Sequence, residues 1–133
     1  MGMMLAASSA TMTLDYGGDA FAKSRDRAVA GGAISVATQI AAAVQLYDLQ
    51  EGRRYEARSL DGLVESEYLK SIPDNPAKAG APEVLIDTNG ERYAAVPLGD
   101  DADGVCRAVA GMTDGDRMGC LDVEGRKTAY LRV

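Results

Sequence analysis

This chain has few residues suited to catalysis, because histidine is absent from its 133 residues. Histidine is the commonest general base and the commonest metal ligand. Serine-histidine and cysteine-histidine catalysis are therefore excluded. An enzyme would have to depend on carboxylates and Lys127, and no pattern places two carboxylates on one element beside an apolar wall that could shift their pKa. We expect a protein that is not an enzyme and holds no cofactor.

The two cysteines, Cys106 and Cys120, are the next candidates for chemistry. Their spacing fits neither a redox Cys-x-x-Cys motif nor a zinc-binding set. Two interpretations are open at this point: two free thiols, or a disulfide, which requires an oxidising compartment. A disulfide that closes a loop of this length would stabilise the fold by about 3 kcal/mol in the chain-entropy model.

Acidic side chains in the last third of the chain could together ligate Ca²⁺, which takes several hard oxygens. However, an Asp-x-Asp-Gly fragment without a downstream bidentate glutamate is only part of an EF-hand, and glycine-aspartate clusters are ordinary turns. We therefore predict no metal site and keep calcium as a minor alternative. The residues concerned are Asp100, Asp101, Asp103, Asp114 and Asp116.

The net charge of −6 makes the overall field repulsive to phosphate backbones. The densest basic patch consists of Arg53, Arg54 and Arg58. We interpret this patch as a solvated loop and expect no nucleic-acid partner.

The strongest pattern runs from Ala20 to Gln50, where apolar residues recur at spacings of three and four. It predicts an amphipathic helix of unusual length, capped by Asp19 and ended by Gly52. Gly31 and Gly32 weaken it by roughly 1 kcal/mol each relative to alanine, so we expect bending or fraying there. The apolar stripe predicted to pack on a sheet consists of Val29, Ala33, Val36, Ala37, Ile40, Val44 and Tyr47.

A second apolar surface on the same helix comprises Ile34, Leu46 and Leu49, which project away from the main stripe. Two interpretations are open. Either the loop that follows covers Leu46 and Leu49, or these side chains contact a neighbouring subunit in a filament.

The residues after the helix predict a connecting loop and then strands. Ser59 should cap a short helix over residues 60–64, and Pro73 and Pro76 force an irregular crossing. Asn89-Gly90 between β-prone segments predicts a hairpin.

Glu124-Gly125 indicates a second hairpin, after one or two helical turns over Val105–Ala110. Pro97 should lie at the end of its strand or on a sheet edge.

These elements predict one α+β domain over residues 1–133, with a long amphipathic helix packed on a roughly four-stranded antiparallel sheet. We divide it into residues 1–18 as the remnant of a membrane-proximal helix or a tag, 19–51 as the long helix, 52–82 as the connecting loop, and 83–133 as the sheet and cysteine region.

In this order the features resemble a type IV pilin or pseudopilin, over about residues 20–133. The stretch Ala41–Tyr47, followed by Ser59–Val64 and then Glu67–Pro73 with Asn75-Pro76, looks like the part of the chain that leaves the pilin helix. Val105–Val109, ahead of the second cysteine, looks like the disulfide-bounded region of the type IVb branch.

The resemblance implies that Cys106 and Cys120 form a structural disulfide. The segment between them is rich in glycine and aspartate and would pack poorly unaided, which agrees with such a clip.

The resemblance also implies a structural subunit of an extracellular pilus, anchored in the inner membrane before assembly and methylated after processing. Its partners would be copies of itself and the assembly machinery of the inner membrane, and its role adhesion, motility or uptake. Two alternatives stay open. One is a type II secretion pseudopilin or a minor pilin, and the other is an extracellular binding module that does not polymerise.

The Gly-Phe processing site and the hydrophobic stretch with a glutamate near its start, both typical of the family, are absent from these residues. The resemblance therefore implies that most of the membrane half of the helix is missing, with Met3–Leu14 as its remnant and Met1-Gly2 added in cloning. Membrane contact would then occur only through the missing segment.

Overall fold

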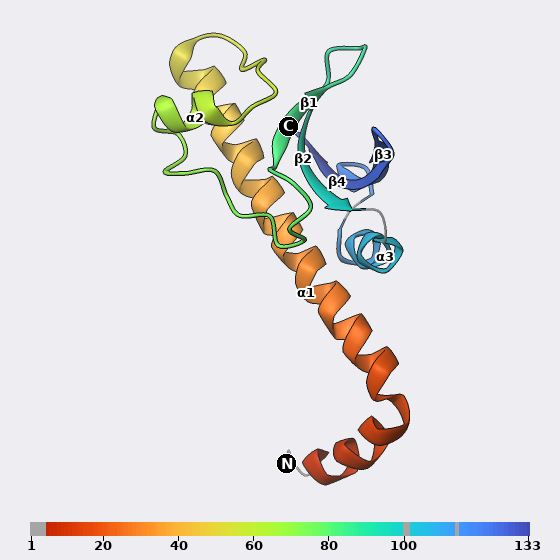
Figure 1. Cartoon of the computed structure of the whole chain (residues 1–133). Coiled ribbons are helices and arrows are strands. Elements are labelled where there is room, and N and C mark those ends of the chain that lie inside the picture. Colours follow the sequence, from red (N-terminus) through yellow and green to blue (C-terminus); the bar gives the residue numbers. More distant parts are fainter. Residues whose placement is uncertain (1–4, 100–101, 114) are drawn as a thin grey trace.

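The computed structural model describes residues 5–99, 102–113 and 115–133, with side chains of the first helix described from Lys23 onward. Its architecture confirms the predicted α+β class: a long helix lies across an antiparallel sheet, and the short helix that precedes the third strand packs against both (Figure 1). The elements are α1 (Leu5–Glu51), α2 (Asp61–Glu65), β1 (Glu83–Ile86), β2 (Arg92–Gly99), α3 (Asp103–Met112), β3 (Met118–Val123) and β4 (Arg126–Arg132).

Helix α1 begins at Leu5, so Asp19 lies inside the helix and does not cap its start. It ends at Glu51, and Gly52 follows with a φ of 71°, the left-handed conformation that ends helices. Gly31 and Gly32 do not interrupt it. Gly32 instead lets the connecting loop come close, because a Cβ there would lie 2.9 Å from Cγ of Pro76.

Helix α2 is capped at Leu60 and not at Ser59, and the Leu60 side chain makes no capping hydrogen bond. The Ser59 hydroxyl accepts a hydrogen bond from the Asp61 N–H, at 3.1 Å. At its other end the Tyr68 N–H donates to the Leu63 carbonyl at 2.9 Å, and Glu67 has a φ of 66°. This pattern is a Schellman motif with glutamate at the position where glycine is preferred.

The irregular crossing at Pro73–Pro76 depends on the buried side chain of Asn75. Its amide nitrogen donates to the carbonyls of Gly80 and Pro97, at 2.8 and 2.7 Å, and its amide oxygen accepts from the Ala77 N–H at 2.8 Å. Asn75 therefore satisfies backbone groups of both the loop and β2, in a region where prolines prevent regular pairing.

The sheet has the strand order β1-β2-β4-β3, and every neighbouring pair is antiparallel. The first hairpin is confirmed, but its connection spans residues 87–91 rather than a two-residue turn. The Asp87 carboxylate accepts hydrogen bonds from the N–H groups of Asn89 and Glu91, which organises the longer loop.

The second hairpin turns at Glu124 and Gly125, whose φ values of 53° and 83° are those of a type I′ turn. Pro97 lies in the central strand β2, beyond Ala95, the last residue paired with β1. The pairing with β4 shifts register between Pro97 and Gly99. Pro97 is thus tolerated near the end of β2, where no ladder donor toward β1 is needed.

The core forms where α1 contacts β2, β4 and α3. Burial of these apolar side chains is the main favourable term for a domain of this size. The largest fully buried side chains are Ile40, Val44, Leu60, Leu63, Val84, Val96 and Val109.

Candidate assembly surface and disulfide region

The apolar stripe of α1 lies where the sequence placed it, facing the sheet. Its members from Ala33 onward are buried, and Val29 is half-buried against the core at the edge of the domain. The buried members are Ala33, Val36, Ala37, Ile40, Val44 and Tyr47. This face of α1 is therefore already occupied by the chain's own sheet.

The opposite face of α1 is open. The Leu46 and Leu49 side chains are 45% and 78% exposed, so the connecting loop does not cover them. Ile34 differs from these two, because it is half-buried and packs against the core.

The charge content of this face sets it apart from the rest of the surface. No charged residue occurs from position 28 to position 47, and the exposed side chains there are mainly neutral polar or small. In a chain with 26% charged residues, a solvated helix face normally carries lysine and glutamate. The exposed face can therefore be dehydrated without stripping water from a charge.

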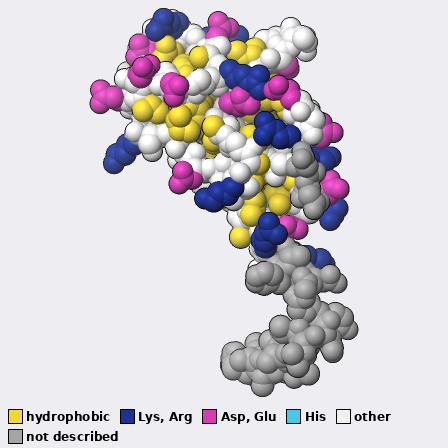
Figure 2. Space-filling view, viewed as in Figure 1, with side chains coloured by type: hydrophobic (Ala, Val, Ile, Leu, Met, Phe, Trp, Pro, Cys, Tyr) yellow, Lys and Arg dark blue, Asp and Glu magenta, His cyan; other side chains and the backbone are white. Residues whose placement is uncertain are grey.

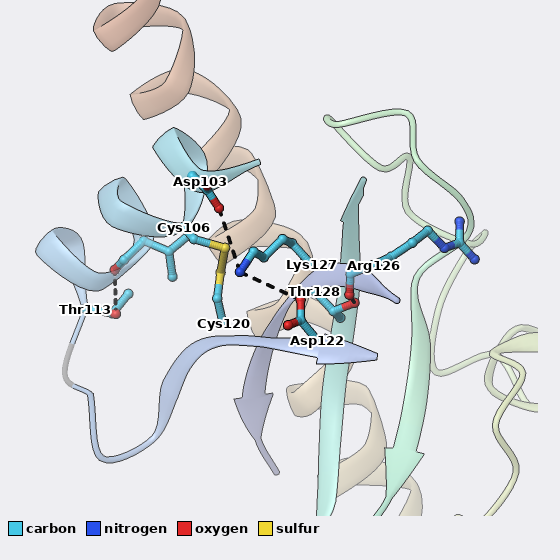
Figure 3. Close-up of a disulfide and its surroundings, with 9 residues drawn as sticks. Asp103, Cys106, Thr113, Cys120, Asp122, Arg126, Lys127 and Thr128 are labelled. Carbon is cyan, nitrogen blue, oxygen red and sulfur yellow. Dashed lines mark hydrogen bonds and ion pairs between the residues drawn. A yellow bond between two sulfur atoms is a disulfide. The ribbon is translucent and has the colours of Figure 1, made fainter. Parts of the chain in front are cut away.

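Cys106 and Cys120 form a disulfide, with their Cα atoms 5.7 Å apart (Figure 3). The bond joins α3 to the edge strand β3. Helix α3 ends close by, where the Thr113 hydroxyl donates to the Val109 carbonyl at 2.7 Å. The predicted disulfide is confirmed, and it joins a helix and a strand that are connected by a glycine- and aspartate-rich segment.

Two of the five acidic residues considered for calcium, Asp103 and Asp116, belong to the part of the chain that the structure describes, and no group of three or more possible metal-ligating side chains occurs in that part. Asp103 begins α3 and lies 3.7 Å from the Lys127 ammonium, which is equally far from Asp122 (Figure 3). Asp116 is exposed after α3. The other three candidates, Asp100, Asp101 and Asp114, lie outside the described residues.

The arginines of the predicted basic patch are each engaged within the chain. The Arg53 guanidinium lies 5.7 Å from the centre of the Tyr47 ring, and Arg54 donates to the Gly90 carbonyl at 2.6 Å. Arg58 pairs with both Glu83 and Glu124, which raises its pKa further above the usual range. Arg54 and Arg58 therefore fasten the connecting loop to the two hairpins, whereas Arg53 contacts α1.

The end of α1 is fixed to the sheet by Asp48 and Arg92, a contact that sequence reasoning missed. Burial raises the pKa of Asp48, but hydrogen bonds from the Arg92 guanidinium and the Tyr55 N–H outweigh it, and the pKa is lower than the usual value. One signal in the sequence could have indicated the contact: Asp48 follows Val44 by four positions, which places both on the buried face.

By length and composition, the part of α1 from Lys23 to Glu51 could cross a membrane, although 44% of its most apolar window is buried in the fold. An apolar N-terminal helix together with a disulfide is typical of a membrane-associated or extracytoplasmic protein. The long helix, the four-stranded antiparallel sheet laid on it and the late disulfide define a pilin-like architecture.

Comparison with known proteins adds no relative to this architecture. No family model matches the chain, and neither the curated proteins nor the solved structures include a significant match.

Proposed function

We propose that this chain is a structural subunit of a type IV pilus-like extracellular filament that assembles through α1. One observation carries the proposal: α1 presents a buried stripe to its own sheet and an exposed face without charges over residues 28–47. A helix face that stayed exposed to water in the functional protein would normally carry charged residues.

Assembly would be mechanical. Copies would pack their exposed α1 faces against one another, with Leu46 and Leu49 as the largest side chains removed from water. Apolar area buried in this way contributes about 25 cal/mol per Å². The sheet and the disulfide region would face outward and form the filament surface.

The proposal includes anchoring of the subunit in the inner membrane before assembly, export into the pilus by the assembly machinery there, and methylation of a processed N-terminus. It also assigns no catalytic role to the chain. A role in adhesion, motility or uptake would follow from the outer surface of the sheet.

Electron microscopy of cells with and without the gene tests the proposal. Surface filaments should be present in the parent strain, absent from the deletion, and restored by the wild-type gene. Leu49→Lys should restore few filaments, because it puts a charge on the assembly face. Leu121→Lys is the matched control, since Leu121 is an exposed apolar residue on the edge strand β3 and points to the face of the sheet opposite Cys120, which packs against the core.

Identical surfaces in the parent and deletion strains would contradict the proposal and favour a binding module that does not polymerise. Short filaments confined to the periplasm would point to the pseudopilin alternative instead.

A further inference from the structure

A group of cations lies at the end of the described domain where α1 leaves it. Lys23, Arg25 and Arg27 of α1 and Arg107 of α3 are all exposed. In the described part of the chain none of the four lies within ion-pair distance of a carboxylate. Figure 2 shows dark blue side chains gathered at this end of the described surface.

The cations frame a recess rather than a flat patch. A hollow of about 220 Å³ lies between α1 and α3, lined by Lys23, Arg27 and Arg107. Asp26 also borders it, but its carboxylate lies against Gly104 at the start of α3, where a Cβ would be only 2.1 Å from Oδ2. The remaining positive charge favours a carboxylate entering from outside.

Carboxylates that form no ion pair with another described residue lie at the opposite end of the domain. Asp61 and Glu65 belong to α2 and Glu67 follows it, and all three are exposed. None of them forms an ion pair with a described cation. A group of magenta side chains lies over this end in Figure 2.

The two groups are separated along α1. Helix α3 packs near Gly31, where its Met112 Cε is 3.7 Å from the position of an added Cβ, whereas the segment after α2 reaches the other end, where the Tyr68 hydroxyl donates to Glu51. Figure 1 shows α2 and α3 beside different ends of the described domain. A second copy displaced along the α1 axis would therefore bring its acidic end to the basic end of the first.

We propose that copies of this chain stack head to tail, with the carboxylates of α2 and of Glu67 just after it in one copy entering the basic hollow between α1 and α3 of the next. Such a contact joins two different surfaces of the same chain and does not close on itself, which is the symmetry that generates filaments. Complementary charges fix the register of such a contact. This inference rests on the proposed filament role. It identifies the contact between the sheet-bearing parts of neighbouring subunits.

Carbodiimide crosslinking of the purified chain tests the contact, because this reagent joins an amine to a carboxylate only where the two touch. An equal mixture of ¹⁴N- and ¹⁵N-labelled chains identifies links between copies by mass spectrometry. We expect links from Lys23 to Glu65 or Glu67 between copies. Lys23→Arg keeps the charge and removes the amine, so it should abolish the link without changing association.

Charge reversal provides the second part of the test. Arg27→Glu with Arg107→Glu, or Glu65→Lys with Glu67→Lys, should each reduce crosslinked dimers and surface filaments about tenfold or more. All four changes in one chain should recover part of both, because positions 27 and 107 again face positions 65 and 67 with opposite charges, while Lys23 keeps its original charge. Glu67→Gly should raise the Tm, since glycine suits its positive φ, and still reduce crosslinking.

The outcomes separate the two proposals. Crosslinks present with no surface filaments in the parent strain would overturn the filament role and leave the contact standing. Filaments present with no Lys23 link, or with reversal variants that assemble like wild type, would overturn the contact alone. It would also be overturned if the Arg27→Glu/Arg107→Glu variant lost binding to phosphatidylglycerol vesicles while its crosslinks and filaments were unchanged.

Discussion

The guanidinium of Arg92 in β2 donates two hydrogen bonds to the carboxylate of Asp48 near the end of α1, from Nη2 to Oδ2 at 2.6 Å and from Nη1 to Oδ1 at 3.1 Å. The same Asp48 oxygen Oδ1 accepts from the Tyr55 N–H at 2.8 Å, and Arg92 also donates to the Tyr55 carbonyl at 3.2 Å. The helix end, the connecting loop and the first residue of β2 thus meet at one ion pair.

Breaking this pair should destabilise the fold. The Asp48 and Arg92 side chains are only 23% and 12% exposed, so removing one of them would leave the charge of the other partly buried and without its ion-pair partner. We expect Asp48→Ala to lower the free energy of unfolding by about 2 kcal/mol in urea denaturation. Glu91→Gln is the control, because the Glu91–Arg132 pair is roughly half exposed and should contribute less than about 1 kcal/mol. Equal losses in the two variants would contradict this role for Asp48.

Stability should fall in acid. The pKa of Asp48 is below its usual 3.8, so the folded carboxylate binds a proton less readily than the unfolded one. Its contribution is complete above the usual pKa and is lost as the pH drops through the folded value. Urea midpoints measured from neutral pH down to about pH 3 should decrease, and Asp48→Asn should make that decrease shallower. A midpoint in Asp48→Asn that falls as steeply as in wild type would assign the acid sensitivity to other groups.

Reduction of Cys106–Cys120 should release the α3–β3 connection. The chain-entropy model gives a loss of about 3 kcal/mol for a loop of this size. The Tm by calorimetry should therefore drop markedly when reductant is added. A Cys106→Ser/Cys120→Ser variant should melt near the reduced wild type and show no response to reductant. Equal melting of oxidised and reduced wild type would show that the clip adds no stability.

Removing the buried Asn75 amide should lower the free energy of unfolding. Asn75→Ala leaves the carbonyls of Gly80 and Pro97 without their donor in a buried place. We expect a loss of about 2–3 kcal/mol by urea denaturation. Asn89→Ala is the matched change in an exposed loop, where only the backbone N–H is used, and it should stay within about 0.5 kcal/mol. A loss at Asn75 as small as at Asn89 would mean that water replaces the amide.

Two adjacent glycines of α1 should respond to alanine in opposite ways. A Cβ on Gly31 would make ordinary contact with Met112 at 3.7 Å, so Gly31→Ala should stabilise by up to about 1 kcal/mol through helix propensity. A Cβ on Gly32 would lie 2.9 Å from Pro76, and overpacking costs roughly 1–3 kcal/mol. Thermal melts should therefore rank Gly31→Ala above wild type and Gly32→Ala below Gly31→Ala. The same Tm for both variants would mean that the Pro76 loop yields freely.

Local features of the fold could be predicted because they depend on neighbours in the chain. The three- and four-residue spacing of Val36, Ile40 and Val44 indicates which face of α1 is buried. Glu124-Gly125 predicts a tight turn because glycine readily adopts the positive φ that such turns require, and both positions have positive φ in the structure. The end of α1 could be predicted for a similar reason, because Gly52 adopts the left-handed conformation that follows the end of a helix.

The tertiary structure alone decided which distant residues meet. Arg92 lies 44 positions from Asp48, and Asn75 reaches a carbonyl 22 positions away, separations over which no periodicity carries information. The same holds for the strand order β1-β2-β4-β3, in which β4 lies beside β2 although α3 and β3 come between them in the chain. Such contacts form because burying the core brings these groups together, where an unpaired polar group would be costly.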